Sequence, residues 1–238
     1  MLVALASDSI SQGSTWLIRS VAARGICQAV GENVTVVDHP LAAERLTRLR
    51  NKATKRAGFR RNLDELAKFL VYESLRDMPV TEIDIDTPMA PTRGIQVSDP
   101  PLIVPVLRAG LGMLDAALDL LPNARVGFVG AKRNEETLLP DAYVNTVPDD
   151  LGGKPVMVLD PMLATGGSLI HTCNLLMDSN AGPITVVCVL AAPEGINAFR
   201  EKGFDAKIVT AAVDERLNEV AFIVPGLGDA GDRQFGLA

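Results

Sequence analysis

Apolar and polar positions along the chain alternate between two periods, and this alternation predicts the fold. Short apolar runs bounded by Pro, Gly or charged residues are typical of strands buried in a parallel sheet. The strands predicted in this way cover residues 34–38, 102–107, 125–129, 156–159, 184–190 and 206–211. Residues 80–86 instead alternate apolar and acidic side chains, which predicts a half-exposed strand.

Segments with a helical period separate these strands. One amphipathic helix, ending near residue 74, has apolar positions at spacings of four, three and four residues: Phe59, Leu63, Leu66 and Leu70. Further helices are predicted over residues 41–50 and 111–121, after Ser168, and as a short piece after Gly195. From residue 102 to 211 strands and helices alternate. This order favours an α/β fold with a central parallel sheet flanked by helices.

Residues 1–33 do not share this pattern. They carry few charges and show only a weak amphipathic patch around Trp16. Asp8 precedes the first Arg, at position 19, whereas a secretory signal places positive charge ahead of its apolar core. A transit peptide and a natural start near Val30 or Val34 are alternatives. We expect a peripheral or poorly ordered extension without chemistry, followed by one domain over residues 34–238.

Composition narrows the class of protein. The chain has 238 residues, 47% hydrophobic and 22% charged, which suits one soluble globular domain. Its net charge of −6 argues against a nucleic-acid partner held by phosphate neutralisation. No apolar run approaches the roughly 20 residues that a membrane span needs. The three cysteines, at positions 27, 173 and 188, have no metal-like spacing, which indicates free thiols in a reducing cytoplasm.

The most informative stretch covers residues 155–168, Pro-Val-Met-Val-Leu-Asp-Pro-Met-Leu-Ala-Thr-Gly-Gly-Ser. A predicted buried strand ends at Asp160, and a loop then opens a helix, which is where ligands of α/β proteins bind. Thr165 to Ser168 supply hydroxyls and backbone N–H groups for an anion such as phosphate. Asp160 can accept two hydrogen bonds from sugar hydroxyls. On these residues alone, an ordinary strand–loop–helix connection without a bound ligand is an equal alternative.

Three places along the chain carry charged residues that could meet an anion. Arg108 follows a predicted buried strand, where it is placed to meet a polyanion or to pair with Asp115 or another helix carboxylate. Residues 131–141 are dense in charge, which is typical of a flap, and Arg133 within them is otherwise an ordinary surface arginine. The basic residues 52–61 indicate a solvated face or a site for an anionic effector.

The glycine-dense residues 222–233 predict an ordered loop that contains no regular element. Its backbone N–H and C=O groups suit recognition of a flat heterocycle, and a flexible tail is the alternative.

Six separated segments resemble uracil phosphoribosyltransferases, which are type I phosphoribosyltransferases. Residues 159–168 resemble the signature that binds 5-phospho-α-D-ribose 1-diphosphate (PRPP), in the Asp-Pro variant of the uracil enzymes. The other segments cover residues 104–113, 133–138, 191–195, 217–219 and 223–233. The likeness extends from about Val34 to the C-terminus.

The resemblance implies a type I phosphoribosyltransferase fold with a flap and a C-terminal hood. It implies the reaction uracil + PRPP → UMP + diphosphate, a step of UMP salvage. The implied catalytic residues are Arg133, Asp160 and Asp229. The residues implied to bind PRPP are Arg108, Arg133, Asp160, Pro161, Met162, Leu163, Ala164, Thr165, Gly166, Gly167, Ser168 and Asp229. Those implied to bind uracil, largely through backbone atoms, are Ile223, Gly228, Asp229 and Ala230. Asp160 is then interpreted as a ribose anchor rather than a metal ligand or general base.

The resemblance also implies a cofactor and partners. Mg²⁺ would reach the protein mainly through PRPP and diphosphate. Most type I relatives have two adjacent acids where this chain has Asp160 and Pro161, so we expect no tight metal site made by the protein alone. Some members respond to GTP and form dimers or tetramers, so a GTP effector and a homo-oligomer are implied. Neither nucleic acid nor a membrane is an expected partner.

Two other functions stay open. One is a regulatory RNA-binding protein on the same fold, which would want a basic surface that the net acidic charge disfavours. The other is a catalytically silent relative that senses PRPP or UMP. Lys132 departs from the family pattern in the flap and leaves this alternative open, whereas Arg108, Asp160 and Asp229 speak against it.

Overall fold

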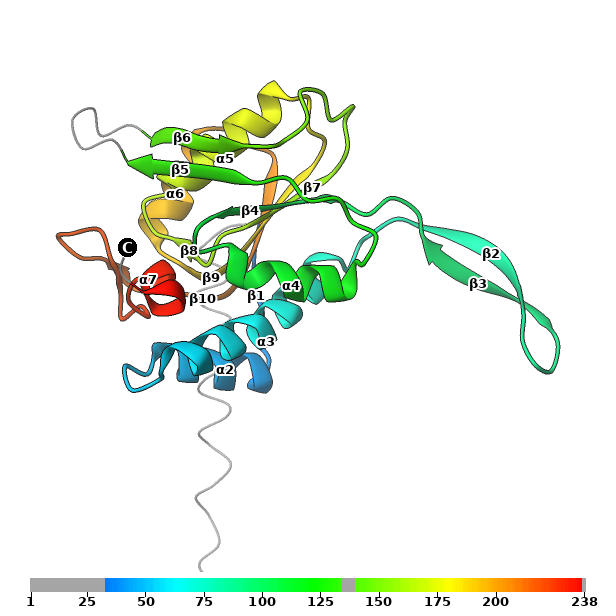
Figure 1. The fold of residues 1–238 in the computed structure, drawn as a ribbon, viewed down its shortest axis with the longest axis horizontal. Helices are drawn as coiled ribbons and strands as arrows, with labels where there is room; N and C mark the ends of the chain where they lie inside the picture. The colour runs from blue at the N-terminus through cyan, green and yellow to red at the C-terminus, as the bar shows by residue number, and fades with distance from the viewer. Residues whose placement is uncertain (1–32, 134–139, 237–238) are drawn as a thin grey trace, which may run out of the picture.

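A parallel sheet lies at the centre of the molecule (Figure 1). The structure is a computed structural model that describes residues 33–133 and 140–236. In this part of the chain eight strands form one sheet, in which neighbouring strands pair in parallel except for β5 with β6. The strand order is β1 (Val34–Val36), β10 (Ala206–Val213), β9 (Ile184–Ala191), β7 (Val156–Leu159), β4 (Leu102–Leu107), β5 (Val129–Arg133) and β6 (Pro140–Asn145), with β8 (Met162–Leu163) also beside β9.

Helices cover both faces of this sheet (Figure 1). One face carries α2 (Pro40–Arg50), α3 (Arg56–Ser74) and α4 (Leu111–Leu120), and the other carries α5 (Gly167–Asp178) and α6 (Pro193–Glu201). Successive strand residues point to opposite faces, so Met157 joins the core under α2–α4 while Val158 joins the core under α5 and α6. The predicted α/β fold class is confirmed.

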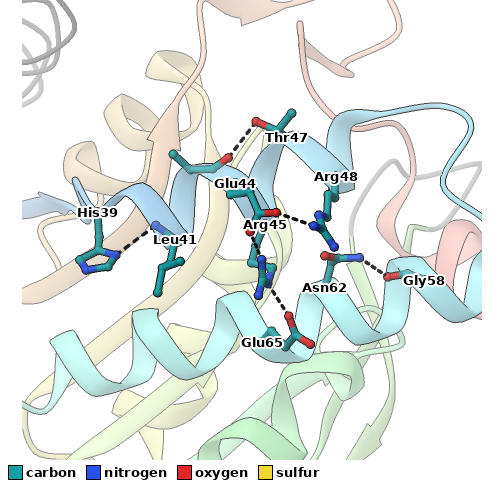
Figure 2. Close-up of polar contacts among 10 residues, drawn as sticks. His39, Leu41, Glu44, Arg45, Thr47, Arg48, Gly58, Asn62 and Glu65 are labelled. Carbon is teal, nitrogen blue, oxygen red and sulfur yellow. Dashed lines mark hydrogen bonds and ion pairs between the residues drawn. The ribbon is translucent and has the colours of Figure 1, made fainter. Parts of the chain in front are cut away.

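The helix pair α2–α3 shows why these residues form helices (Figure 2). His39 caps α2, because its Nδ1 accepts a hydrogen bond from the backbone N–H of Leu41 at 3.1 Å, and Pro40 occupies the first turn. Arg45 joins α2 to Glu65 of α3 through an ion pair. The predicted apolar face of α3 is fully buried, as expected from its spacing: Phe59, Leu63, Leu66 and Leu70.

Two strand predictions need correction. The strand predicted over residues 125–129 lies at Val129–Arg133 instead, because Val126 makes only an isolated bridge with Ile103. The strand predicted over residues 80–86 is present as β2 (Val80–Asp86), but it is more exposed than expected. It pairs with the unpredicted β3 (Pro91–Val97), and this hairpin extends away from the sheet and helices (Figure 1).

The predicted flap begins and ends as paired strands. The backbones of Ala131 to Arg133 and of Pro140 and Asp141 form part of an antiparallel β5–β6 ladder. Residues 134–139 lie outside the described residues, as do residues 1–32 of the predicted extension.

The prediction that residues 222–233 contain no regular element is wrong at both ends. Ile223 and Val224 form β12, which pairs with β11 (Arg216–Leu217). Residues Ala230–Phe235 form α7, and Asp229 caps it by accepting a hydrogen bond from the Asp232 N–H at 2.8 Å. A short strand and a capped helix thus hold the glycine-dense loop. Within the described residues, no helix has the length and apolar character needed to cross a membrane.

Candidate active site

The loop after β7 lies at the carboxyl edge of the sheet, between the end of the strand and the start of α5. Gly166 adopts a left-handed conformation with a φ of 84°, which glycine tolerates without strain, and α5 begins at the next residue. Thr165, Gly167 and Ser168 are exposed. Gly166, the N-cap residue, has no side chain to cap α5, and Thr165 Oγ1 accepts only a long hydrogen bond, of 3.4 Å, from the Gly167 N–H. The N-terminus of this helix can therefore offer backbone N–H groups and the partial positive end of its dipole to a phosphate.

Neighbouring backbone fixes this loop. The carbonyl of Pro161 accepts hydrogen bonds from the N–H groups of Val189 and Leu190 of β9, both at 3.0 Å. Where α6 begins, Gly195 lies so close that a Cβ there would approach the carbonyl oxygen of Ala164 to 2.2 Å. The sheet and α6 therefore pre-form the loop.

Asp160 directly follows β7 and is buried, with 8% of its surface exposed. Burial raises the pKa of its carboxyl from 3.8 to about 7, and a hydrogen bond from the Met162 N–H at 3.3 Å opposes this shift only in part. A group that titrates near neutrality inside a ligand cavity is a candidate functional residue. As a carboxylate, it can accept hydrogen bonds from two neighbouring hydroxyls.

Of the two arginines predicted to meet an anion, the structure describes the side chain of Arg108 but not that of Arg133. Arg108 follows β4, and its side chain is 47% exposed, with the guanidinium 3.4 Å from the carboxylate of Asp232 on α7. This contact agrees with the helix-carboxylate alternative, but it is long and solvent-exposed, so the guanidinium can still meet an anion. Arg133 is described only as the last residue of β5.

One cavity of about 260 Å³ joins residues 160–168, the predicted phosphate-binding segment that we call the phosphate loop, to the glycine-dense loop. Predicted residues that line it are Asp160, Met162, Ala164, Ser168, Ile223, Gly228, Asp229 and Ala230. Pro161, Leu163, Thr165, Gly166 and Gly167 lie in the loop but do not line this cavity, and neither does Arg108. The structure thus brings together two segments more than fifty residues apart in the sequence.

Sequence reasoning missed four lining residues: Ala109, Ala221, Phe222 and Gly231. Each lies next to a predicted site residue or at the end of the glycine-dense segment, so position along the chain was the available signal. Two further cavities flank β1, one of about 310 Å³ bordered by Arg50 and one of about 530 Å³ bordered by Tyr72, and neither contains a predicted site residue.

Cys173 and Cys188 are buried free thiols, and burial raises the pKa of each to about 12. A thiol with so high a pKa is a poor nucleophile. The structure agrees with their interpretation as core residues.

A central, mostly parallel sheet flanked by helices, with a glycine-containing loop at a strand–helix junction opposite a loop from the C-terminal region, is the architecture of type I phosphoribosyltransferases. The similarities of the chain agree with this class. Adenine phosphoribosyltransferase from Leishmania donovani, at 15% identity, shares the fold with a TM-score of 0.53 over 81% of this chain and 88% of that one.

Other similarities are closer. The sequence pattern of the family "Uracil phosphoribosyltransferase" matches residues 36–237. A protein of that name from Corynebacterium diphtheriae is 52% identical over 85% of this chain and 96% of its own length. Another of that name, from a Nocardioides species, is 55% identical over 85% of this chain and 97% of its own. A solved structure of a protein from Aquifex aeolicus, at 40% identity, matches 86% of this chain and 99% of that one with a TM-score of 0.79. The chain belongs to the uracil phosphoribosyltransferase family.

Proposed function

We propose that this protein transfers the phosphoribosyl group of PRPP to uracil, giving UMP and diphosphate. The observation that carries the proposal is the cavity of about 260 Å³ that is lined both by the loop after β7 and by the glycine-dense loop. Membership of the uracil phosphoribosyltransferase family supports the same assignment. N1 of uracil attacks C1 of PRPP as the bond from C1 to diphosphate breaks, through a transition state with oxocarbenium character. The proton that N1 loses passes to the departing diphosphate or to water.

The phosphate loop would hold the sugar phosphate. Residues Thr165 to Ser168 would bind the 5′-phosphate at the N-terminus of α5, and Asp160 would accept hydrogen bonds from the ribose hydroxyls. Arg108 and Arg133 would meet the diphosphate, whose negative charge grows as it leaves, so positive charge at that place lowers the barrier. Asp229 would face PRPP from the opposite loop.

The glycine-dense loop would recognise the base. Uracil presents alternating C=O and N–H groups, which backbone atoms of Ile223, Gly228 and Ala230 can match. Cytosine would place a donor against a donor and leave buried polar groups unpaired, at a cost of roughly 1–3 kcal/mol each. The proposed enzyme therefore prefers uracil through loop geometry rather than through a charged side chain.

Mg²⁺ fits this site as an ion carried by the substrate. The cavity offers two carboxylates, Asp160 and Asp229, and no group of three or more His, Cys, Asp or Glu in the described residues is arranged to hold a metal. Mg²⁺ is typically bound by one or two carboxylates together with water and substrate phosphates. When bound, it would neutralise charge on the leaving diphosphate.

Three further properties belong to the proposal. The exposed hydrophobic side chains of the β2–β3 hairpin support a homo-oligomer, a dimer or tetramer. The exposed basic residues Lys52, Lys55 and Arg61 are candidates for an anionic effector such as GTP. Buried free thiols support a cytoplasmic location.

The proposal is tested by incubating the purified protein with uracil, PRPP and Mg²⁺ and measuring UMP and diphosphate. Equimolar formation of both products is expected. Binding of PRPP or UMP without turnover by folded protein would favour the sensor alternative, and binding of RNA without turnover would favour the regulatory one.

A further inference from the structure

The loop that would recognise the base, residues 223–230, is held at one glycine by groups outside the cavity. Gly226 lies midway between Ile223 and Gly228 and has a φ of 61°. Its N–H donates to Asp214 Oδ2 at 2.8 Å, and its C=O accepts from Arg50 Nη1 at 2.9 Å. Both backbone polar groups of this residue are therefore fixed by side chains from distant elements.

These two side chains also bind each other. Arg50 ends α2, and its guanidinium forms a two-bond fork with the carboxylate of Asp214, which follows β10, at 2.8 and 2.5 Å. The Asp214 side chain is 4% exposed and that of Arg50 is 25% exposed. A bidentate, largely buried pair of this kind fixes orientation as well as distance.

A second arginine fixes the next residue of the loop to the same end of α2. Arg233 of α7 donates to the carbonyl of Leu227 at 2.7 Å and to that of Asn51 at 2.8 Å. It also lies over the ring of Phe59, 4.4 Å from its centre. Gly226 and Leu227 are thus both tied to the residues where α2 ends.

The Arg50–Asp214 pair is separate from the substrate cavity. Ile223, Gly228, Asp229 and Ala230 line that cavity, whereas neither Arg50 nor Asp214 does. On the proposed function, the backbone atoms of these lining residues recognise uracil, so any displacement of Gly226 moves the recognising atoms on both sides of it.

We infer that Arg50 and Asp214 are positioning residues, which set base affinity and base choice by fixing Gly226. This inference rests on the proposed function. The physical reason is that backbone groups, unlike side chains, cannot rotate to restore a lost hydrogen bond. A displacement of the loop by about 1 Å is therefore enough to weaken binding of the base. The phosphate loop, by contrast, is held by β9 and α6 and does not depend on this pair.

Arg50→Lys is the most direct test. Lysine keeps the positive charge beside Asp214 and so avoids a buried unpaired carboxylate, but a single ammonium cannot reproduce the fork together with the bond to Gly226. We expect the KM for uracil to rise about tenfold or more, with the affinity for PRPP, measured by calorimetry, changed less than about twofold. Selectivity for uracil over cytosine should fall in the same variant.

Arg45→Met is the matched control. Arg45 lies on the same helix, is similarly exposed at 22%, and pairs with a carboxylate of another element, Glu65 (Figure 2). Its removal should leave the KM for uracil within about twofold of wild type. A purely structural role of Arg50 would lower kcat in proportion to the folded fraction and leave KM unchanged.

Asp214→Asn provides a second variant, which removes the charge while keeping a hydrogen-bonding side chain of the same shape. It should also raise the KM for uracil with PRPP affinity retained. If both variants fold and keep the wild-type KM and base selectivity, the inference is wrong. If wild-type protein makes no UMP at all, the proposed function fails instead, and the two failures are therefore distinct.

Discussion

Among single residues, Asp160 shows the clearest combination of burial, a raised pKa and a place in the candidate substrate cavity. The residue is 8% exposed and lines the candidate substrate cavity, and among residues 33–133 and 140–236 its carboxyl receives one hydrogen bond, from Met162. A protein gains nothing in stability from a carboxylate buried with so few partners, because desolvation favours its neutral form. The ribose hydroxyls of a bound substrate would provide the missing hydrogen bonds. Asp160 is thus better suited to ligand binding than to holding the fold together.

Asp160→Asn should lower kcat/KM for PRPP at least tenfold, on the order of 1.4 kcal/mol, because the amide has one accepting oxygen where the carboxylate has two. Steady-state kinetics at saturating uracil provides the measurement. Asp178→Asn, an exposed change at the opposite end of α5, is the control and should be neutral. Wild-type kinetics in Asp160→Asn would mean that this carboxyl does not contact the sugar.

The same substitution should change the pH dependence of stability. Because burial raises the pKa of Asp160 from 3.8 to about 7, the folded protein binds more protons than the unfolded chain between these values. The free energy of unfolding therefore falls as pH rises from about 4 to about 7, by at most about 1.4 kcal/mol per pH unit from this group.

Asp160→Asn removes this slope. Urea denaturation should find the variant more stable than wild type at pH 8, with the difference shrinking toward pH 4. Parallel stability curves for the two proteins across that range would show that the carboxyl is not desolvated in the folded state.

At the scale of elements, the phosphate loop depends on how closely α6 approaches it. A Cβ on Gly195 would lie 2.2 Å from the carbonyl oxygen of Ala164, so an alanine there must displace loop backbone. We expect Gly195→Ala to raise the KM for PRPP severalfold and to lower the melting temperature.

Gly58→Ala is the matched control, because its Cβ would meet only the Thr54 methyl group, at 3.4 Å. Alanine in α3 should leave kinetics unchanged and stability equal or slightly higher, by up to about 1 kcal/mol. Equal behaviour of the two variants in both assays would contradict the role assigned to Gly195.

The contacts within the described part of the chain do not account for the stability of the β2–β3 hairpin. It extends from the body of the molecule (Figure 1) and exposes apolar side chains, with Ile95 70% and Met89 92% accessible. A two-stranded hairpin alone is marginally stable in water, and exposed apolar surface of this kind is typical of an interface. A second copy of the chain is the partner that the proposed homo-oligomer supplies.

Ile95→Lys should therefore shift the protein toward the monomer mass of 25.3 kDa in light scattering after size exclusion. Gln96→Lys adds the same charge to the neighbouring exposed position and should leave the oligomer intact. A wild-type monomer, or an unchanged mass in Ile95→Lys, would show that this hairpin is not an interface between copies.

Across the whole molecule, most buried strands and the amphipathic helix α3 could be predicted from the sequence, because each has a local apolar pattern typical of its structure. The strands β3 and β6 were not, since their sequences, Pro91 to Val97 and Pro140 to Asn145, lack an apolar run and form strands only by pairing with a neighbour. Strand β5 was misplaced for a similar reason, because pairing with β4 and β6 decides its limits.

The site was predictable in part. Asp160 was predictable from its place after a buried strand, and the glycine-dense loop from its composition. The resemblance to a family was what assigned both to one site. The support behind the loop has no such local signal: Arg50 and Asp214 are 164 positions apart, and nothing local marks either. Likewise, a Cβ on Gly112 would meet the buried side chains of Gln234 and Leu63, which come from distant helices. Such features depend on tertiary packing rather than on sequence periodicity.

On the proposed function, one cavity joins a PRPP-binding loop to a loop selective for uracil. This function is tested most directly by measuring nucleotide formation from PRPP and Mg²⁺ with uracil, cytosine, adenine, hypoxanthine and guanine in parallel, with Asp160→Asn as the matched impaired protein. We expect UMP and equimolar diphosphate from uracil, little or no nucleotide from the other bases, and a strongly reduced rate in the variant. Folded wild-type protein that forms no UMP, or that uses a purine in preference to uracil, would contradict it.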